Sequence, residues 1–380
     1  MRITEVETIY LRLPQVEAKE SGVQDALIVR VHTDEGLVGI GEVDSSPAVI
    51  HAIIHAPLSH SIACGLRQLL LGEDPLERER LWRKLYDGSY YFGRRGAAIH
   101  ALSGIDIALW DIAGKFFGVP IHRLLGATYR DRLQAYASVL FPTTPEATRE
   151  KVQWLKEMGW RAMKFGWGGF GWDERTDVAL VQALRDGAGE GCALMVDVGM
   201  RWDRVTALKM ARRLVEFDLL WLEEPLPADD LDGYVQLTQN APIRIAAGEE
   251  MATRYEFRVL IERGGVHVVQ PDLSRCGGLS EGWKIAFLAE LQGRWVVPHC
   301  FSTGVLMAAS LHFLASLPPE RAPFVEFPME PSPLFTDLVE PPFSLQPDGT
   351  VKVPEGEGLG ITLNEEVIQR FSVTKIGASR

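Results

Sequence analysis

The sequence is poor in cysteine, in positive charge and in long apolar runs, and each shortage excludes a class of protein. Its four cysteines lie far apart and form no Cys-x-x-Cys pair, which indicates reduced packing residues: Cys64, Cys192, Cys276 and Cys300. The formal net charge of -12 argues against nonspecific binding to nucleic acid or to an anionic membrane, because both need a basic surface. We also expect no transmembrane helix and no signal peptide, since the apolar runs look too short and the chain starts in a strand-like pattern. A cytoplasmic location follows as the default.

The rest of the composition, with 46% hydrophobic residues over 380 positions, is that of a globular protein large enough for more than one domain. Strand patterns come first, at 2–13 and in a hairpin at 26–43. Helical patterns follow at 47–71, 75–86 and 96–117. Strands followed by helices predict a segregated α+β domain that ends near residue 130.

From Leu133 onward short apolar runs alternate strictly with helical segments. The expected strands are 134–139, 161–165, 193–197, 219–223, 243–247, 266–270, 295–298 and 323–327. Eight such alternations predict an α/β fold of the (β/α)8 type, and a doubly wound open sheet is the alternative.

After Pro328 the alternation stops, and the tail predicts a hairpin around 343–353 and a short helix at 364–371. Because this tail is too short to fold alone, we expect it to pack on the first domain. The predicted division is a capping domain at 1–130, completed by 340–380, and a barrel domain at 131–339.

Single acidic residues, and then one histidine, close the apolar runs at an almost constant stride. The positions are Asp197, Glu223, Glu249, Asp272 and His299, and subtraction gives steps of 26, 26, 23 and 27 residues. In a barrel these strand ends face one site, so three carboxylates from consecutive strands would converge. An all-oxygen set favours Mg²⁺, with Mn²⁺ possible, over Zn²⁺. The alternative is that each acid caps a helix or pairs with an arginine, and the neighbours Glu224 and Glu250 leave the assignment of two ligands open.

Four further residues at strand ends are candidates for the chemistry. A hydrogen bond from His299 to Asp272 would fix the imidazole tautomer and make His299 a general base or acid, although a satisfied core histidine is the alternative. Lys164 ends the second strand and could neutralise a substrate carboxylate or stabilise an enolate, or form an ion pair with the acids. Glu326 on the eighth strand could be a hydrogen-bonding acid or a buried ion-pair partner.

Together these residues lie in motifs that resemble the enolase superfamily, specifically its mandelate racemase-like subgroup, over the whole chain. The motifs are Gly104-Ile-Asp-Ile-Ala-Leu-Trp-Asp-Ile-Ala-Gly-Lys, Val196-Asp197, Trp221-Leu-Glu-Glu-Pro, Gly248-Glu249, Gln270-Pro-Asp272 with Gly277-Gly278, and Pro298-His299. The resemblance implies a capping α+β domain over a modified (β/α)7β barrel. It also implies Mg²⁺ on Asp197, Glu223 and Glu249, a His299–Asp272 dyad and Glu326 near the substrate carboxylate. The implied chemistry is removal of the proton α to a carboxylate, giving an enediolate stabilised by the metal.

The chain departs from this family pattern at two glycines. Members with bases on both faces of the substrate carry Lys-x-Lys on the second strand, whereas this chain has Lys164-Phe165-Gly166, and Gly166 has no basic side chain. Gly199 stands where a polar residue is frequent and excludes the histidine of some dehydratases. A racemase needs two bases, so we expect dehydration of an acid sugar, an aldonate or aldarate, to a 2-keto-3-deoxy acid with His299 alone.

The alternatives are a sugar-acid lactone cycloisomerase or epimerase of the same superfamily and, from another class, a metal- or ligand-binding pseudoenzyme. Specificity is expected from cap segments 15–24 and 44–51, with Trp167 and Trp172 facing them. Family resemblance also implies a homo-oligomer.

Overall fold

The computed structural model describes residues 1–19, 21–60 and 63–373. The chain begins with a three-stranded antiparallel sheet made of β1 (Ile3–Arg12), β2 (Asp25–Thr33) and β3 (Val38–Val43), in that order. Gly36, with φ of +82°, lies in the turn between β2 and β3, as the hairpin prediction requires. Both faces of β1 contribute to the core: Ile3 and Val6 are buried in one hydrophobic cluster, and Ile9 and Leu11 in another.

Helices cover this sheet: α1 (Pro47–His55), α2 (Leu66–Leu70), α3 (Arg78–Gly88), α4 (Tyr90–Gly93), α5 (Ala97–Phe117) and α6 (Ile121–Leu124). The prediction of one helix over 47–71 is wrong, because α1 ends at His55. Ala56, which precedes Pro57, has extended backbone with ψ of 137°. A residue before proline is sterically pushed out of the helical region, and this ends the helix.

The expectation that every apolar run is too short to span a membrane is wrong for α5. Its 21 residues are long and apolar enough to cross a membrane by length and composition. However, 89% of the apolar segment is buried inside the protein. The helix lies against β3 at van der Waals distance: a Cβ placed on Gly41 would come within 1.9 Å of the carbonyl oxygen of Gly104. The apolar character of α5 therefore reflects a core helix that contacts the sheet and the barrel.

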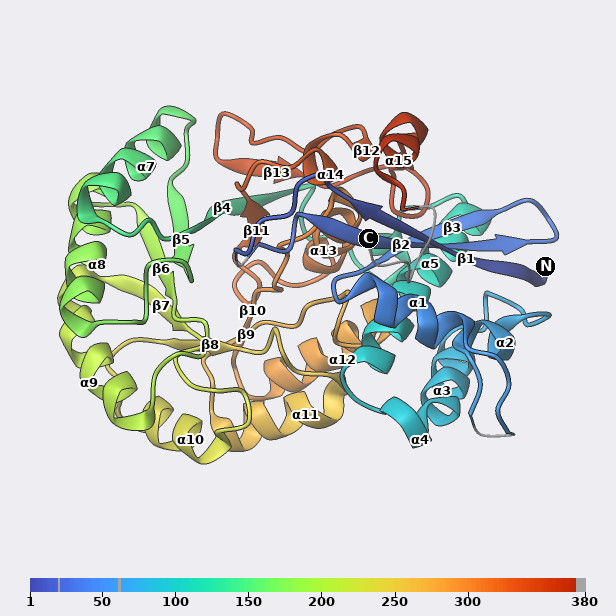
Figure 1. Cartoon of the computed structure of the whole chain (residues 1–380), viewed down its shortest axis with the longest axis horizontal. Helices are drawn as coiled ribbons and strands as arrows, with labels where there is room; N and C mark the ends of the chain where they lie inside the picture. Colours follow the sequence, from blue (N-terminus) through green and yellow to red (C-terminus); the bar gives the residue numbers. More distant parts are fainter. Residues whose placement is uncertain (20, 61–62, 374–380) are drawn as a thin grey trace.

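The second part of the chain is a curved parallel sheet with helices outside it (Figure 1). Its strands are β4 (Arg132–Leu140), β5 (Ala162–Gly166), β6 (Ala193–Asp197), β7 (Leu219–Glu223), β8 (Ile245–Ala247), β9 (Val268–Val269), β10 (Trp295–Val296) and β11 (Val325–Pro328). They pair in the order β10-β9-β8-β7-β6-β5-β4-β11. In the described ranges no ladder joins β10 to β11, so the hydrogen-bonded sheet is open at that seam.

Helical segments connect successive strands: α7 (Pro145–Glu157), α8 (Glu174–Ala188), α9 (Arg204–Leu214) with the turn η1 (Val215–Phe217), α10 (Leu231–Asn240), α11 (Thr253–Val259) with η2 (Leu260–Gly264), α12 (Gly278–Leu291) and α13 (Gly304–Ala315). This alternation confirms the predicted (β/α)7β barrel with an α+β cap and excludes the doubly wound sheet. Inside the barrel Tyr136 and Trp221 meet edge to face with ring centroids 5.8 Å apart. These rings fill the interior below the strand ends.

The tail contains α14 (Pro333–Thr336), β12 (Val339–Glu340), β13 (Thr350–Lys352), β14 (Thr362–Leu363) and α15 (Glu365–Phe371). The predicted hairpin is only partly correct: the turn at Gly349 is present, but β13 pairs antiparallel with the first residues of β4, ahead of the segment of β4 that pairs with β11. Helix α15 confirms the expected short helix, and Asn364 caps it. The tail reaches the first sheet, where Val373 N donates to Tyr10 O, and Figure 1 shows α15 above β1 and β2. The division at residues 130 and 340 stays a prediction.

Candidate active site

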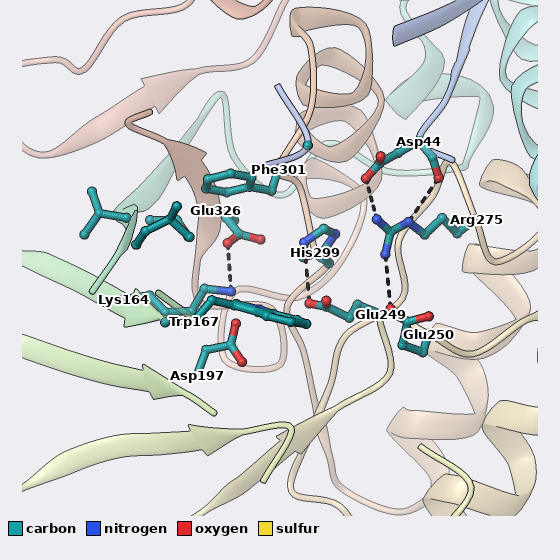
Figure 2. A pocket seen from close by; sticks show the side chains of 15 residues that line it. Asp44, Lys164, Trp167, Asp197, Glu249, Glu250, Arg275, His299, Phe301 and Glu326 are labelled. Carbon is teal, nitrogen blue, oxygen red and sulfur yellow. Dashed lines mark hydrogen bonds and ion pairs between the residues drawn. The ribbon is translucent and has the colours of Figure 1, made fainter. Parts of the chain in front are cut away.

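A cavity of about 200 Å³ lies at the carboxyl ends of the barrel strands, where the cap meets the barrel (Figure 2). Its lining comes from the cap, from β4, β5, β6 and β11, and from the loops after β5, β8, β9 and β10. The lining residues are Gly22, Asp44, Ser138, Val139, Leu140, Lys164, Gly166, Trp167, Asp197, Glu249, Glu250, Arg275, His299, Phe301 and Glu326.

Three buried carboxylates cluster beside this cavity; Asp197 and Glu249 line it, and Glu223 lies behind them without exposed surface. Asp197 closes β6, Glu223 closes β7, and Glu249 follows β8. Each offers one oxygen within 4.8 Å of the others. The Trp221 indole nitrogen donates to Glu223 Oε2 at 2.9 Å, and the Gly199 backbone nitrogen donates to Asp197 Oδ1 at 2.9 Å. The strand ends and these two donors thus hold the carboxylates in place.

The electrostatics of the three acids fit a divalent cation. Burial, and then the negative charge of Glu223, raises the pKa of Asp197 well above its usual value. Burial also raises the pKa of Glu223, although the Lys164 ammonium acts in the opposite direction. A bound cation would offset both the burial and the mutual repulsion of these carboxylates. Because all donor atoms are oxygen, the set suits a hard ion.

The neighbouring acids are placed differently from the three carboxylates. Glu224 is buried, with φ of +37°, and its Oε1 accepts a hydrogen bond from Gly248 N at 3.1 Å. The Glu250 carboxylate lies 3.8 Å from Arg275 Nη1. The geometry brings Glu223 and Glu249 to the cluster and leaves Glu224 and Glu250 outside it.

Lys164 lies beside the three acids and is almost fully buried. Its Nζ forms ion pairs with Glu223 and, at 2.8 Å, with Glu326 Oε1. Burial lowers the pKa of Lys164, but the charges of Glu223 and Glu326 outweigh it and raise the pKa above its usual value. Glu326 Oε2 also accepts a hydrogen bond from Cys300 N at 2.8 Å. The ion-pair arrangement considered for Lys164 and Glu326 is therefore present.

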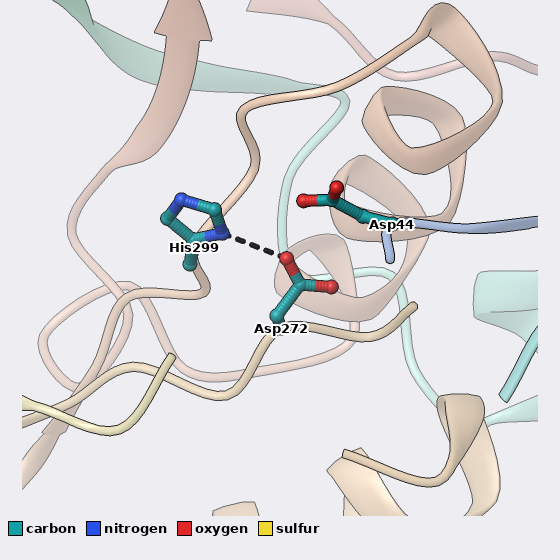
Figure 3. Close-up of side chains that lie close together, drawn as sticks. All are labelled: Asp44, Asp272 and His299. Carbon is teal, nitrogen blue, oxygen red and sulfur yellow. Dashed lines mark hydrogen bonds and ion pairs between the residues drawn. The ribbon is translucent and has the colours of Figure 1, made fainter. Parts of the chain in front are cut away.

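His299 and Asp272 form a hydrogen-bonded pair (Figure 3). The His299 Nδ1 to Asp272 Oδ2 distance is 2.7 Å, and the other carboxylate oxygen accepts from Ser274 N and Oγ at 2.7 and 2.6 Å. With the proton on Nδ1, Nε2 is the free atom, 3.4 Å from Glu249 Oε2. Burial lowers the pKa of His299, but the surrounding carboxylates, Glu249 first, outweigh it and raise the pKa to about 10.

Asp44, Asp272 and His299 also offer ligand atoms within 4.8 Å of one another. Figure 3 shows the three side chains facing a common point. Their atoms already have partners, since Asp272 bonds His299 and Ser274, and Asp44 Oδ2 accepts from Arg275 Nη2 at 2.7 Å. We interpret this second group as a hydrogen-bond network and not as a metal site.

Two glycines shape the side of the cavity formed by β5 and β6. A Cβ on Gly166 would lie 2.6 Å from the Asp197 Cβ, and one on Gly199 would lie 2.6 Å from the Trp167 ring. Trp167 itself has φ of +50°, which places its indole over Gly199 and in the cavity wall. The position that carries a base in two-base relatives of the family pattern is therefore closed even to a methyl group.

The structure adds residues that sequence reasoning missed: Ser138, Arg275 and Phe301 all line the cavity. Arg275 could have been found, because it lies three residues after Asp272 in a turn where its backbone nitrogen bonds Asp272 O.

Trp172 was expected to face the cap, but it is 72% exposed and does not line the cavity. Its ring instead stacks with Arg201, whose Cζ lies 4.3 Å from the ring centroid. From the expected cap segments, Gly22 and Asp44 line the cavity.

Comparison with known proteins gives two family matches. Residues 3–126 match the mandelate racemase / muconate lactonizing enzyme N-terminal domain, and residues 146–367 match the enolase C-terminal domain-like family. D-galactarolactone cycloisomerase of Agrobacterium fabrum is 34% identical over 91% of this chain and 90% of its own length. L-talarate/galactarate dehydratase of Salmonella typhimurium is 35% identical over 90% of this chain and 81% of its own length. The crystal structure of 3,6-anhydro-D-galactonate cycloisomerase from Zobellia galactanivorans matches with a TM-score of 0.88 and 29% identity, covering 98% of this chain and 100% of that one.

Proposed function

Because this chain belongs to the enolase superfamily, in the mandelate racemase / muconate lactonizing enzyme family, we propose that it is an Mg²⁺-dependent dehydratase of an acid sugar. The substrate would be an aldonate or an aldarate, and the product a 2-keto-3-deoxy acid. The observation that carries the proposal is the single imidazole base: His299 with its partner Asp272 reaches the acidic cluster, while Gly166 supplies no second base.

Asp197, Glu223 and Glu249 would hold the magnesium ion, since they form the buried all-oxygen cluster. When bound, Mg²⁺ would supply positive charge that stabilises the negative charge developing on the substrate carboxylate as the α-proton leaves. Lys164 would add a second positive charge at the same end of the cavity, and Glu326 would position Lys164 through their 2.8 Å ion pair.

Proton transfer would be the task of His299. A cation on Glu249 would offset the charge that contributes most to the raised pKa of His299 and so favour the neutral imidazole. Its Nε2 then takes the proton from C2, and Asp272 stabilises the resulting imidazolium through the Nδ1 hydrogen bond. His299 then returns that proton to the C3 hydroxyl, the C3–oxygen bond breaks, and water leaves. The enol that remains becomes the 2-keto-3-deoxy acid by losing the proton of its C2 hydroxyl and gaining one at C3, so one water molecule is lost overall.

Replacement of His299 by asparagine tests this assignment. We expect His299→Asn to lower kcat by at least about 1000-fold, because the α-proton loses its only base. His32→Asn, on the cap strand β2, is the matched control and should keep wild-type turnover. Full activity of His299→Asn in 2-keto acid formation would exclude the role proposed for this residue.

Lactone cycloisomerisation is the second candidate, and it is favoured by the two relatives named cycloisomerases. The same base could remove the α-proton while a ring oxygen, and not hydroxide, departs. Both reactions end in a 2-keto-3-deoxy acid, because loss of the β-oxygen leaves an enol in each case. Mass spectrometry separates them: dehydration gives a product lighter than its substrate by one water molecule, whereas ring opening of a lactone gives an isomer of the substrate.

A binding protein without turnover is the alternative from another class, suggested by Gly166 and Gly199. Mg²⁺ binding without turnover and without α-proton exchange in D₂O, across a library of acid sugars and lactones, would support it against both enzymes.

A further inference from the structure

One end of the active-site cavity carries charges that the proposed reaction does not use. Arg275 lies there between Asp44 of the cap and Glu250 of the loop after β8. We refer to these three residues as the distal charge group. Figure 2 shows them on one side of the cavity and Lys164 on the other, with His299 between. A substrate with its carboxylate near Lys164 would extend its other end past His299 toward the distal charge group.

Acidic residues surround the guanidinium of Arg275, and Asp44 accepts its two hydrogen bonds. Its Nη2 donates to Asp44 Oδ2 at 2.7 Å, and its Nε donates to the Asp44 backbone oxygen at 3.1 Å. Its Nη1 lies 3.8 Å from Glu250 Oε1, and its Nε lies 3.9 Å from Asp272 Oδ2. Burial lowers the pKa of Arg275, but these acids, Asp44 first, outweigh it and raise the pKa above its usual value. Arg275 is therefore charged and already neutralised.

The side chains at this end of the cavity carry a net negative charge, which disfavours an anion. Arg275 contributes one positive charge, whereas Asp44 and Glu250 contribute two negative ones, and Asp272 is shared with His299. A second substrate carboxylate would have to compete with Asp44 for the guanidinium and would face like charges at close range. Sugar hydroxyls differ, because they can donate to carboxylate oxygens and accept from N–H groups without adding charge.

The size of the cavity strengthens the argument. At about 200 Å³ it lies below the range of about 300–1,000 Å³ usual for small-molecule sites, so the distal end of a sugar acid has little room to avoid these charges.

We propose that the distal charge group selects an acid sugar with a single carboxylate and a hydroxylated far end, such as an aldonate, and rejects aldarates, which carry a second carboxylate. This inference rests on the proposed function, because it takes the reacting carboxylate to lie at the Lys164 end. Rejection of the second carboxylate is selection by unfavourable interaction, which complements the favourable contacts to hydroxyls.

The test uses the full-length chain with Mg²⁺ and pairs of aldonates and aldarates that share the configuration of carbons 2 to 5. We expect kcat/KM for an aldonate substrate to exceed that of its matched aldarate by roughly 100-fold, the size of a like-charge penalty of this kind. Exchange of the α-proton in D₂O, followed for both members of each pair, reports binding in a reactive position even when no product forms.

Two variants test whether the preference for aldonates comes from the distal charge group. Asp44→Asn keeps the shape of the side chain and removes one negative charge, so the aldonate preference should shrink by about 10-fold. Glu250→Gln, in which the replaced side chain is 42% exposed, should act in the same direction and disturbs folding less. Glu146→Gln on the surface of α7 changes net charge equally, far from the cavity, and should leave the preference unchanged.

The outcomes separate the inference from the function on which it rests. Equal kcat/KM for a matched aldarate and aldonate would overturn the inference and leave the dehydratase proposal standing. An unchanged preference in both Asp44→Asn and Glu250→Gln would also overturn it. Absence of turnover and of exchange with every acid sugar would instead overturn the proposed function itself.

Discussion

Gly166 ends β5 where the family pattern would place a second basic residue, and its surroundings make the substitution costly. Even alanine adds a Cβ that would lie 2.6 Å from the Asp197 Cβ. We therefore expect Gly166→Ala to lower the free energy of unfolding by about 1–3 kcal/mol, as overpacking does, and to weaken Mg²⁺ binding. Gly166→Lys should show the same losses and no racemase activity. Calorimetric Mg²⁺ titration and α-proton exchange, measured for both variants, test these expectations. Tight Mg²⁺ binding together with new racemase activity in Gly166→Lys would contradict the packing argument.

His312 provides a pH dependence at the residue scale. Its Nε2 donates to Leu359 O at 3.0 Å, so its Nδ1 must accept from His122 Nδ1, also at 3.0 Å. Burial lowers the pKa of His312 to about 3 from its usual 6.5. Between these values the unfolded chain binds a proton that the folded chain does not, so stability falls as pH drops below 6.5.

The measurement is urea unfolding of wild type and His312→Gln at pH 7, 6 and 5. Relative to the variant, wild type should lose up to about 1.4 kcal/mol of unfolding free energy per pH unit below 6.5. Parallel pH profiles of the two proteins would contradict the assignment of a neutral buried His312.

At the scale of elements, a buried carboxylate from the cap joins the cap to the barrel. Glu42 on β3 accepts hydrogen bonds from Ser302 Oγ, from Thr303 N and Oγ1, and from Leu306 N, at 2.6 to 3.0 Å. These donors form the start of α13, directly after the loop that carries His299. Burial raises the pKa of Glu42 to about 7, while these hydrogen bonds and the helix N-terminus favour the charged carboxylate.

Glu42→Gln places an amide N–H₂ among these donors and leaves at least one of them without an acceptor. We expect the free energy of unfolding to fall by about 1–3 kcal/mol, the cost of a buried unsatisfied polar group. Glu35→Gln on the exposed turn beside β3 serves as the control and should change stability by less than about 0.5 kcal/mol. Chemical unfolding at pH 7 measures both, and equal stability of Glu42→Gln and wild type would show that the contact adds nothing.

Elements also show what the sequence can and cannot predict. Asp197 and Glu223 were predictable because a strand buried on both faces reads as an apolar run, and the acid that follows marks its exposed end. The break at Pro57 was visible in principle but was outweighed by the apolar pattern on both sides. The pairing of β13 with β4 could not be read from 350–352, because a three-residue strand carries no signal for a partner more than 200 positions away.

At the scale of the whole molecule, the candidate site combines residues that local patterns identify and residues that only the assembled fold brings together. His299 and Asp272 end consecutive strands, so their proximity follows from barrel topology. Arg275 and Asp44, by contrast, are 231 positions apart and meet only because the cap covers the barrel. The contact between His299 and Asp272 could be predicted from sequence, whereas the distal charge group could not.

Metal removal is a test at this scale. A ligand that binds only the folded chain stabilises it, so Mg²⁺ at 100 times its Kd should add about 2.7 kcal/mol to the free energy of unfolding. EDTA should reverse the gain. Asp197→Asn should abolish the response to Mg²⁺ and be more stable than wild type without metal, since one repulsive charge is gone. Thermal unfolding of both proteins with and without Mg²⁺ measures this stabilisation. If Mg²⁺ stabilised Asp197→Asn as much as wild type, the ion would bind elsewhere.

The contact between Glu42 and the start of α13 also bears on how the protein is made. Glu42 and Leu306 are 264 positions apart, so during synthesis the cap strand β3 emerges long before its partners. Until α13 has left the ribosome, the Glu42 carboxylate has none of the four hydrogen bonds that satisfy it in the folded state. We therefore expect the first sheet to reach its final stability only after α13 has been made, so that the two parts of the chain complete their folding together.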